Sequence, residues 1–374
     1  MILLTTTCYD KKFWTPLSYA YLVFLRDDYS LASVLRIPTP ASLSPTIKPG
    51  LRGISVVPWE EKVYAVCTWN RIYLVNVSQF KIVECLSHPA MYDLHGLVST
   101  KDGFWVTAAG KGLFMFDRSG ALKHKVMVDG QAFSDFHDSR YVGKSTQGKY
   151  PNSFSYVFSD DNGNIYLSVQ KKDDAVDSTK AFEGDGGIYQ YNMSKGEMDP
   201  VFVGTSWVHD GLRVGDNFYF HDSKKGLFKI NPKEKKQQIV SPLGAEYFYR
   251  GLCHNPVTNE ILSFGTEKES MKNKYGFQRV AGRFQPQMAV LDEDLNLVRV
   301  VDLSWMYKLL DRCSDIRFFS AAHMIDPIFE RPEKHFKDRM YALSYSCLSP
   351  LIFFGAKCIR GAKKIAVTFK KNQG

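Results

Sequence analysis

The sequence contains a repeated four-segment unit, and this repeat restricts the possible folds more than any other feature. Each clear unit begins with a His close to a Gly, continues with an aromatic segment and a Gly-Leu-Phe segment, and closes with a short fourth segment. One unit consists of Leu94–Leu97, Gly103–Thr107, Gly112–Asp117 and Leu122-Lys123. The other consists of His209–Leu212, Asp216–Phe220, Gly226–Asn231 and Gln237–Val240. Their lengths and their apolar-polar alternation indicate β-strands.

The residues between these segments favour tight hairpins. The connections carry Asp-Gly, Gly-Asp-Asn and Lys-Lys-Gly, which supply the backbone conformations that short hairpin turns need. Aromatic residues make up 14% of the chain, and Phe and Tyr favour strands. Each unit is therefore predicted to be a four-stranded antiparallel sheet.

Four weaker copies of the unit extend the pattern along the chain. They begin at Arg52, at Asn152, at Arg250 and near Ile316, and the starting positions 52, 95, 152, 209 and 250 lie 43, 57, 57 and 41 residues apart. Four-stranded units of about 40–45 residues, some with loop insertions, are typical of β-propellers. We therefore predict an all-β fold, a single β-propeller of six four-stranded blades, with seven blades as the alternative.

The predicted blades divide one domain, residues 1–374, without a linker between them. Their expected bounds are 50–90, 91–150, 151–206, 207–247, 248–313 and 314–374. Residues 1–49 contain strand-like segments at Tyr19–Leu25 and Leu31–Ile37 but no full blade. We expect these N-terminal strands to close the ring beside a C-terminal strand at Lys364–Phe369, which removes exposed sheet edges.

Charge and cysteine content exclude several classes of protein. The formal net charge is +9, but the excess lies in short Lys runs typical of loop tips, and no nucleic-acid-binding motif accompanies it. The seven cysteines are scattered without a CxxC pair, so neither a disulfide framework nor a structural zinc site is predicted. No apolar segment has the length of a signal peptide or a membrane span, so a cytoplasmic location is expected.

The blade starts carry a recognisable pattern. Arg52-Gly53-Ile54, Asp93-Leu94-His95-Gly96 and Pro151-Asn152-Ser153 follow one another at successive blade starts. In this the chain resembles poorly characterised bacterial members of the six-bladed β-propeller superfamily, over residues from about 50 to 320. The resemblance implies the fold more than an activity. Lactonase-type members of the superfamily bind calcium through Glu, Asn and Asp, and their acidic motifs have no match here.

The first residues of the inner strands are the candidate site, because in a propeller they face the mouth of the central channel. The aligned residues are Arg52, His95, Asn152, His209, Arg250 and, in the last blade, Arg317 or His323. In one reading these side chains satisfy strand ends and inter-blade hydrogen bonds. In a second, Arg52, Asn152, Arg250 and Arg317 bind a small anionic ligand such as a sugar acid or phosphorylated metabolite, and His95 and His209 act as acid and base.

Two further readings remain open. The imidazoles of His95, His209 and His323, with His254 or His137, could hold a divalent transition metal as cofactor, although the neighbouring Arg residues would repel a cation. Alternatively, the protein is a structural or interaction scaffold, including a virion-type component, with no catalysis. Long insertions at 171–185 and 266–287 would then contact a protein partner.

Overall fold

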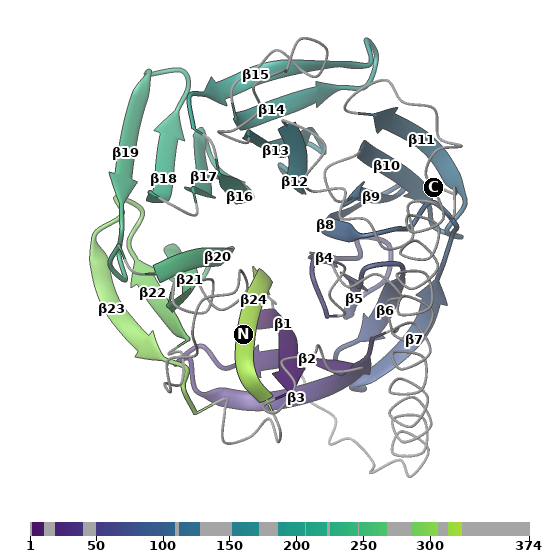
Figure 1. Cartoon of the computed structure of the whole chain (residues 1–374), viewed down its shortest axis with the longest axis horizontal. Helices are drawn as coiled ribbons and strands as arrows, with labels where there is room; N and C mark the ends of the chain where they lie inside the picture. The colour runs from purple at the N-terminus through teal and green to yellow at the C-terminus, as the bar shows by residue number, and fades with distance from the viewer. Residues whose placement is uncertain are drawn as a thin grey trace, which may run out of the picture.

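The described strands form a closed ring of sheets. A computed structural model describes residues 2–10, 19–39, 50–108, 112–127, 152–171, 186–205, 207–222, 225–245, 247–267, 286–305 and 313–323. Within these residues there are 24 strands and no helix. They make six four-stranded antiparallel sheets arranged around one axis (Figure 1). The prediction of a six-bladed propeller is confirmed, and the seven-bladed alternative is not needed.

Each blade is one sheet, and we number the blades around the ring. Blade 1 contains β24 (Cys313–His323), β1 (Ile2–Asp10), β2 (Tyr19–Leu25) and β3 (Leu31–Pro38). Blade 2 contains β4 (Ile54–Val56), β5 (Val63–Cys67), β6 (Ile72–Asn76) and β7 (Lys81–Leu86). Blade 3 contains β8 (Leu94–Thr100), β9 (Gly103–Ala108), β10 (Gly112–Asp117) and β11 (Leu122–Met127).

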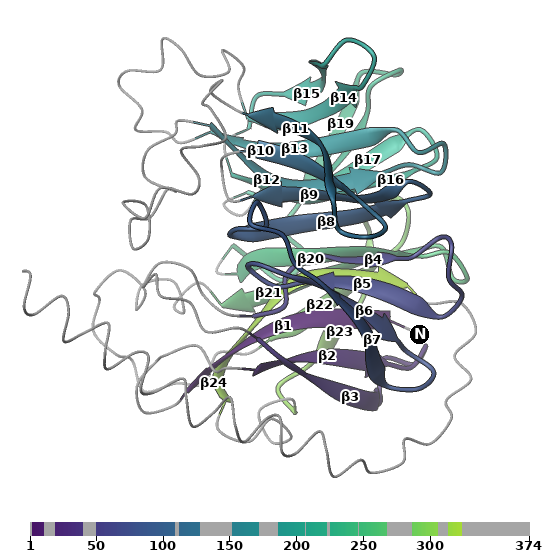
Figure 2. The same cartoon turned by 90° about the vertical axis from the view of Figure 1, so that its right-hand side faces the viewer.

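The other three blades follow the same order from the inner to the outer strand. Blade 4 contains β12 (Asn152–Ser159), β13 (Ile165–Lys171), β14 (Gly187–Asn192) and β15 (Glu197–Val203). Blade 5 contains β16 (Val208–Val214), β17 (Asn217–Asp222), β18 (Gly226–Asn231) and β19 (Lys236–Val240). Blade 6 contains β20 (Tyr247–Asn255), β21 (Glu260–Glu267), β22 (Gln287–Leu291) and β23 (Leu297–Asp302), and Figure 2 shows the blades edge-on.

Blade 1 closes the ring by joining strands from distant parts of the chain. The inner strand β24 pairs antiparallel with β1, from Ile2 opposite His323 to Asp10 opposite Cys313. N-terminal strands thus close the ring, as predicted, and they supply three of the four strands of this blade. Their partner is β24. The strand expected at Lys364–Phe369 lies outside the described residues.

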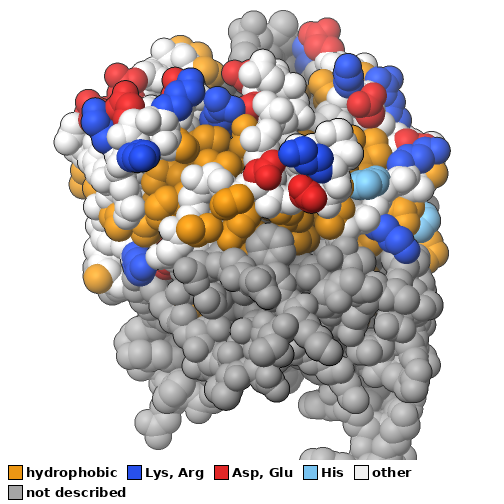
Figure 3. All heavy atoms as spheres, turned by 90° about the horizontal axis from the view of Figure 1, so that it is seen from above, with side chains coloured by type: hydrophobic (Ala, Val, Ile, Leu, Met, Phe, Trp, Pro, Cys, Tyr) orange, Lys and Arg blue, Asp and Glu red, His pale blue; other side chains and the backbone are white. Residues whose placement is uncertain are grey.

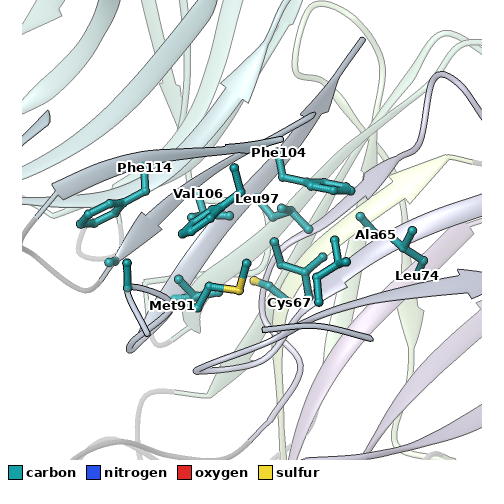
Figure 4. Close-up of a cluster of buried hydrophobic side chains, with 14 of the residues drawn as sticks. Ala65, Cys67, Leu74, Met91, Leu97, Phe104, Val106 and Phe114 are labelled. Carbon is teal, nitrogen blue, oxygen red and sulfur yellow. The ribbon is translucent and has the colours of Figure 1, made fainter. Parts of the chain in front are cut away.

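Hydrophobic side chains fill the space between neighbouring blades. Along β1, Ile2 and Leu4 pack with residues of blade 6, whereas Leu3 packs with residues of blade 2, because successive side chains of a strand point to opposite faces. Strands in the middle of a blade are therefore buried on both faces, as in β5 and β9. Figure 4 shows the cluster between blades 2 and 3, where Leu74 and Phe104 contribute from opposite sheets.

The outermost strands face solvent and carry several exposed apolar residues. Those on blades 4, 5 and 6 are Val203, Ile239, Leu297, Val298 and Val300. Figure 3 looks onto the outer side of the ring and shows hydrophobic side chains interspersed with charged ones. No helix within the described part of the chain is long and apolar enough to cross a membrane.

Candidate functional site

The inner strands all begin on one face of the ring, which we call the entry face. The side chain of Arg52, just before β4, reaches the start of β8, and Ser155 near the start of β12 donates to the carbonyl of Val208 at the start of β16. At the opposite face, Asp160 after β12 pairs with Arg213 near the end of β16. The inner strands β4 and β8 therefore begin side by side, and so do β12 and β16, as expected for a propeller whose inner strands run in one direction.

Arg52 is a buried inter-blade contact. Its Nη1 donates to Asp93 Oδ1 at 2.7 Å and to the carbonyl of Leu94 at 2.7 Å, and only 5% of the residue is exposed. The carbonyl of Arg52 accepts a hydrogen bond from Thr5 Oγ1 at 2.6 Å. Arg52 thus connects blades 1, 2 and 3. This arrangement favours the structural reading for this residue.

Asp93 and His95 share the environment of Arg52. Burial of the Asp93 carboxyl opposes its ionisation, but Arg52 and His95 outweigh this effect and lower its pKa to about 2. His95 Nε2 lies 3.7 Å from Asp93 Oδ1. Burial lowers the pKa of His95, the positive charges of Arg52 and Arg250 lower it further, and the result is about 4 in spite of Asp93. His95 is therefore neutral at pH 7.

Arg250 and His209 form the second group of the site. Arg250 Nη2 donates to His209 Nε2 at 3.1 Å, so His209 presents this nitrogen as an acceptor. The guanidinium carbon of Arg250 lies 4.8 Å from the centroid of the Phe248 ring. Blades 3 and 6 lie on opposite sides of the ring axis (Figure 1), yet the charge of Arg250 acts on His95. This electrostatic effect links the two groups across the ring axis.

The strand register changes one part of the sequence alignment. In blade 3 the bulge between Leu94 and Leu97 contains His95. In blade 5 the corresponding bulge lies between His209 and Leu212, so Asp210 occupies the position of His95 and His209 that of Leu94. A bulge adds residues to one strand only. The segments Leu94–Leu97 and His209–Leu212 already show the same correspondence in the sequence, because His95 and Asp210 both precede Gly-Leu. The two imidazoles therefore do not stand at matched positions.

The remaining predicted residues are placed only by their strands. Asn152 is the first residue of β12, whereas Arg317 lies within β24 and His323 is the last residue of β24. The structure does not describe these three side chains. Asn152 and Arg317 remain predictions as ligand-binding residues.

The metal reading depends on His323 and on two further histidines. His254 lies near the end of β20, away from the entry face, where its Nε2 contacts Asn259 Oδ1 at 2.9 Å. His137 lies outside the described residues. Among the described side chains, no group of three His, Cys, Asp or Glu is placed to hold a metal ion. The guanidinium groups near His95 and His209 would also repel a cation.

The predicted partner loops depart from the entry face. The first insertion connects Lys171, the last residue of β13, with Gly187, the first residue of β14. The second connects Glu267, the last residue of β21, with Gln287, the first residue of β22. In each blade this connection returns to the face where the inner strand begins, since successive strands are antiparallel. The insertions themselves lie outside the described residues.

Sequence reasoning missed several contributors to the site. Asp93 was part of the Asp-x-His-Gly pattern, which was the available signal for its role beside Arg52 and His95. The sequence pattern gives no signal for Asp210, because neighbours in a regular strand point to opposite faces and Asp210 follows the candidate His209. The bulge changes this, and Asp210 contacts His221 Nδ1 at 2.9 Å.

Comparison with known proteins shows the fold alone. No family model matches the chain, and no curated protein matches it. A protein of unknown function from Bacteroides caccae is similar in structure, with TM-score 0.52 and 7% identity over 87% of this chain and 100% of that chain. A chain of a nidogen/laminin complex aligns with TM-score 0.50 and 8% identity, over 86% and 98% of the two chains. TolB from Acinetobacter baumannii aligns with TM-score 0.50 and 11% identity, over 86% and 66%.

Proposed function

We propose that the protein binds a small anionic ligand on the entry face, near the ring axis. Arg250 is the main anion-binding group, and His209 and His95 contribute hydrogen bonds. The observation that carries the proposal is the electrostatic environment of His95, whose pKa falls to about 4 because of burial and because two guanidinium groups on different blades act on it. Burial opposes charge of either sign, but the positive charges of Arg52 and Arg250, which also lower this pKa, favour an anion.

The chemical class of the ligand follows from these groups. A guanidinium group binds carboxylate and phosphate through paired hydrogen bonds, and a neutral imidazole donates one more. Sugar acids and phosphorylated metabolites offer both charge and hydroxyl groups. Arg52 supports the site indirectly, because it holds Asp93 and contributes to the field at His95.

Turnover of the ligand is a narrower form of this proposal. A His with a pKa of about 4 is unprotonated at pH 7, so His95 would act as a hydrogen-bonding group or weak base and not as a general acid. His209 Nε2 accepts a hydrogen bond from Arg250, so its role in proton transfer stays a prediction. Binding without turnover needs only the geometry described above.

Isothermal titration calorimetry tests the proposal with inorganic phosphate, glucuronate and glucose 6-phosphate, and with glucose as the neutral comparison. We expect at least one anion to bind and glucose to bind more weakly. Arg250→Ala should weaken binding by about 1.5–3 kcal/mol, the range for hydrogen bonds to charged groups. Arg118→Ala is the matched control, since Arg118 is an exposed Arg that contacts Lys101 in blade 3. Wild-type protein that binds none of the three anions would refute the proposal.

A protein-interaction role is the second candidate. It is favoured by the exposed apolar residues of β23, where Leu297 is 50% and Val298 56% exposed. Exposed apolar residues on an edge strand are a common basis for protein contacts. Affinity purification with wild-type and Val298→Lys baits tests this role, because a specific partner should be lost from the variant.

A further inference from the structure

Three buried polar side chains form a hydrogen-bonded line between blades 5 and 6. Asp210 Oδ2 lies 2.9 Å from His221 Nδ1, and His221 Nε2 lies 2.8 Å from Ser263 Oγ. The three residues belong to β16, β17 and β21, and their exposure is 4% or less. We call Asp210, His221 and Ser263 the inter-blade relay.

The chemistry of the groups sets the direction of each hydrogen bond. An ionised carboxylate only accepts, so His221 donates from Nδ1 to Asp210. With Nδ1 protonated, the neutral imidazole accepts at Nε2, and the Ser263 hydroxyl donates to it. The same sequence of bonds activates the serine of many hydrolases. Ser263 is fully buried, however, and a nucleophile must reach its substrate.

Asp210 also fixes the backbone beside Arg250. Its Oδ2 accepts a second hydrogen bond, from the backbone N–H of Gly251 at 2.8 Å. Its carbonyl accepts one from Ser168 Oγ of blade 4. Asp210 lies in the bulge of β16 and Gly251 in the bulge of β20, and both have a left-handed backbone, with φ of 56° and 86°. At Asp210, which is not a glycine, this backbone conformation is unfavourable and needs stabilising contacts.

The relay therefore lies directly behind the predicted anion-binding pair. Asp210 is the neighbour of His209 in the chain, Gly251 is the neighbour of Arg250, and Arg250 Nη2 lies 3.1 Å from His209 Nε2. A displacement of Asp210 moves both backbones from which these side chains extend. Preorganised groups bind a ligand more tightly because less freedom is lost on binding.

We infer that the inter-blade relay is a positioning device, which holds Arg250 and His209 in the geometry that binds an anion. This inference rests on the proposed function of the entry face. Ser263 acts on Asp210 through His221. A substitution at the buried serine should therefore change the affinity for the anion. None of the three residues is expected to touch the ligand.

The experiment compares Ser263→Ala with Asp160→Asn. Each variant removes a contact of blade 5 with a neighbouring blade, but Asp160 lies at the opposite face, where it pairs with Arg213 at 2.6 Å. We expect both variants to unfold at lower urea concentration than the wild type. Only Ser263→Ala should also weaken the binding of inorganic phosphate, by at least threefold in calorimetry. Equal phosphate affinity of Ser263→Ala and wild type would overturn the inference.

Two measurements on the folded wild type keep the inference testable if Ser263→Ala fails to fold. Proton NMR should show a downfield resonance from the His221 Nδ1–H, because this proton lies in a hydrogen bond to a buried carboxylate and is protected from exchange with water. Absence of this resonance would contradict the relay. Treatment with a fluorophosphonate should leave Ser263 unlabelled, whereas labelling would identify it as a nucleophile and overturn the positioning role. If the wild type binds no anion but shows the resonance, the proposed function and the positioning role are both refuted. The hydrogen bond between His221 and Asp210 is then still confirmed.

Discussion

Replacement of Arg52 by Met should destabilise the protein strongly. The ion pair between Arg52 and Asp93 spans 2.7 Å, and the two side chains are 6% and 11% exposed. Removal of one partner from a buried pair leaves the other charge uncompensated, at a cost of about 3–5 kcal/mol. Methionine retains most of the aliphatic stem, so lost packing contributes little. Urea denaturation followed by tryptophan fluorescence measures the free energy of unfolding.

The double variant Arg52→Met/Asp93→Asn separates the charge effect from other effects. Since no uncompensated charge remains, the double variant should be more stable than the sum of the single changes predicts, by about 1 kcal/mol or more. Lys62→Met is the control, because Lys62 pairs with Glu61 at 3.8 Å on the surface and should change stability by less than about 0.5 kcal/mol. If Arg52→Met costs less than about 1 kcal/mol, Arg52 is not a structural contact between blades and our reasoning is wrong.

Three more predictions follow from the described contacts. The folded pKa of His95, about 4, lies below the unfolded value of 6.5, so stability should fall as pH decreases from 6.5 to 4. Thermal denaturation across this range should show the fall in wild type and less of it in His95→Asn, and equal slopes would contradict us. Gly53→Ala should cost about 1–3 kcal/mol in urea denaturation, because a Cβ there would lie 2.5 Å from Leu97 N, and an unchanged midpoint would contradict this packing. Deletion of residues 1–10 removes β1, and light scattering should detect aggregation rather than a monomer.

The blades that could be predicted are those whose four strands are continuous in the sequence. Blades 3 and 5 combine hairpin turns with alternating aromatic residues, and the strands at Gly112–Asp117 and Gly226–Asn231 are where the repeat indicates them. Blade 1 could not be predicted as a unit, because its inner strand comes from a distant part of the chain. Its first outer strand, Ile2–Asp10, contains three consecutive Thr residues and none of the repeated Gly-Leu-Phe pattern.

The candidate site was predicted less completely than the fold. The repeat brings Arg52, His95 and Arg250 to the same face, and the structure agrees with this placement. The pattern of residue types could not show that Arg52 is paired with Asp93, because the pairing depends on the distance between two blades. The aligned segments Leu94–Leu97 and His209–Leu212 do place Asp210 opposite His95, but they could not show that both residues lie in a bulge, since a bulge has no fixed residue signature.

The pairing of β24 with β1 has a consequence for synthesis of the protein. The ribosome releases Ile2–Asp10 long before Cys313–His323. At about 5–20 residues per second, the interval between β1 and β24 is roughly 15–60 s. During this time β1 has no inner partner, and its free edge can pair with other nascent chains. Translation speed and chaperone occupancy, rather than equilibrium stability, should therefore decide the yield of native protein.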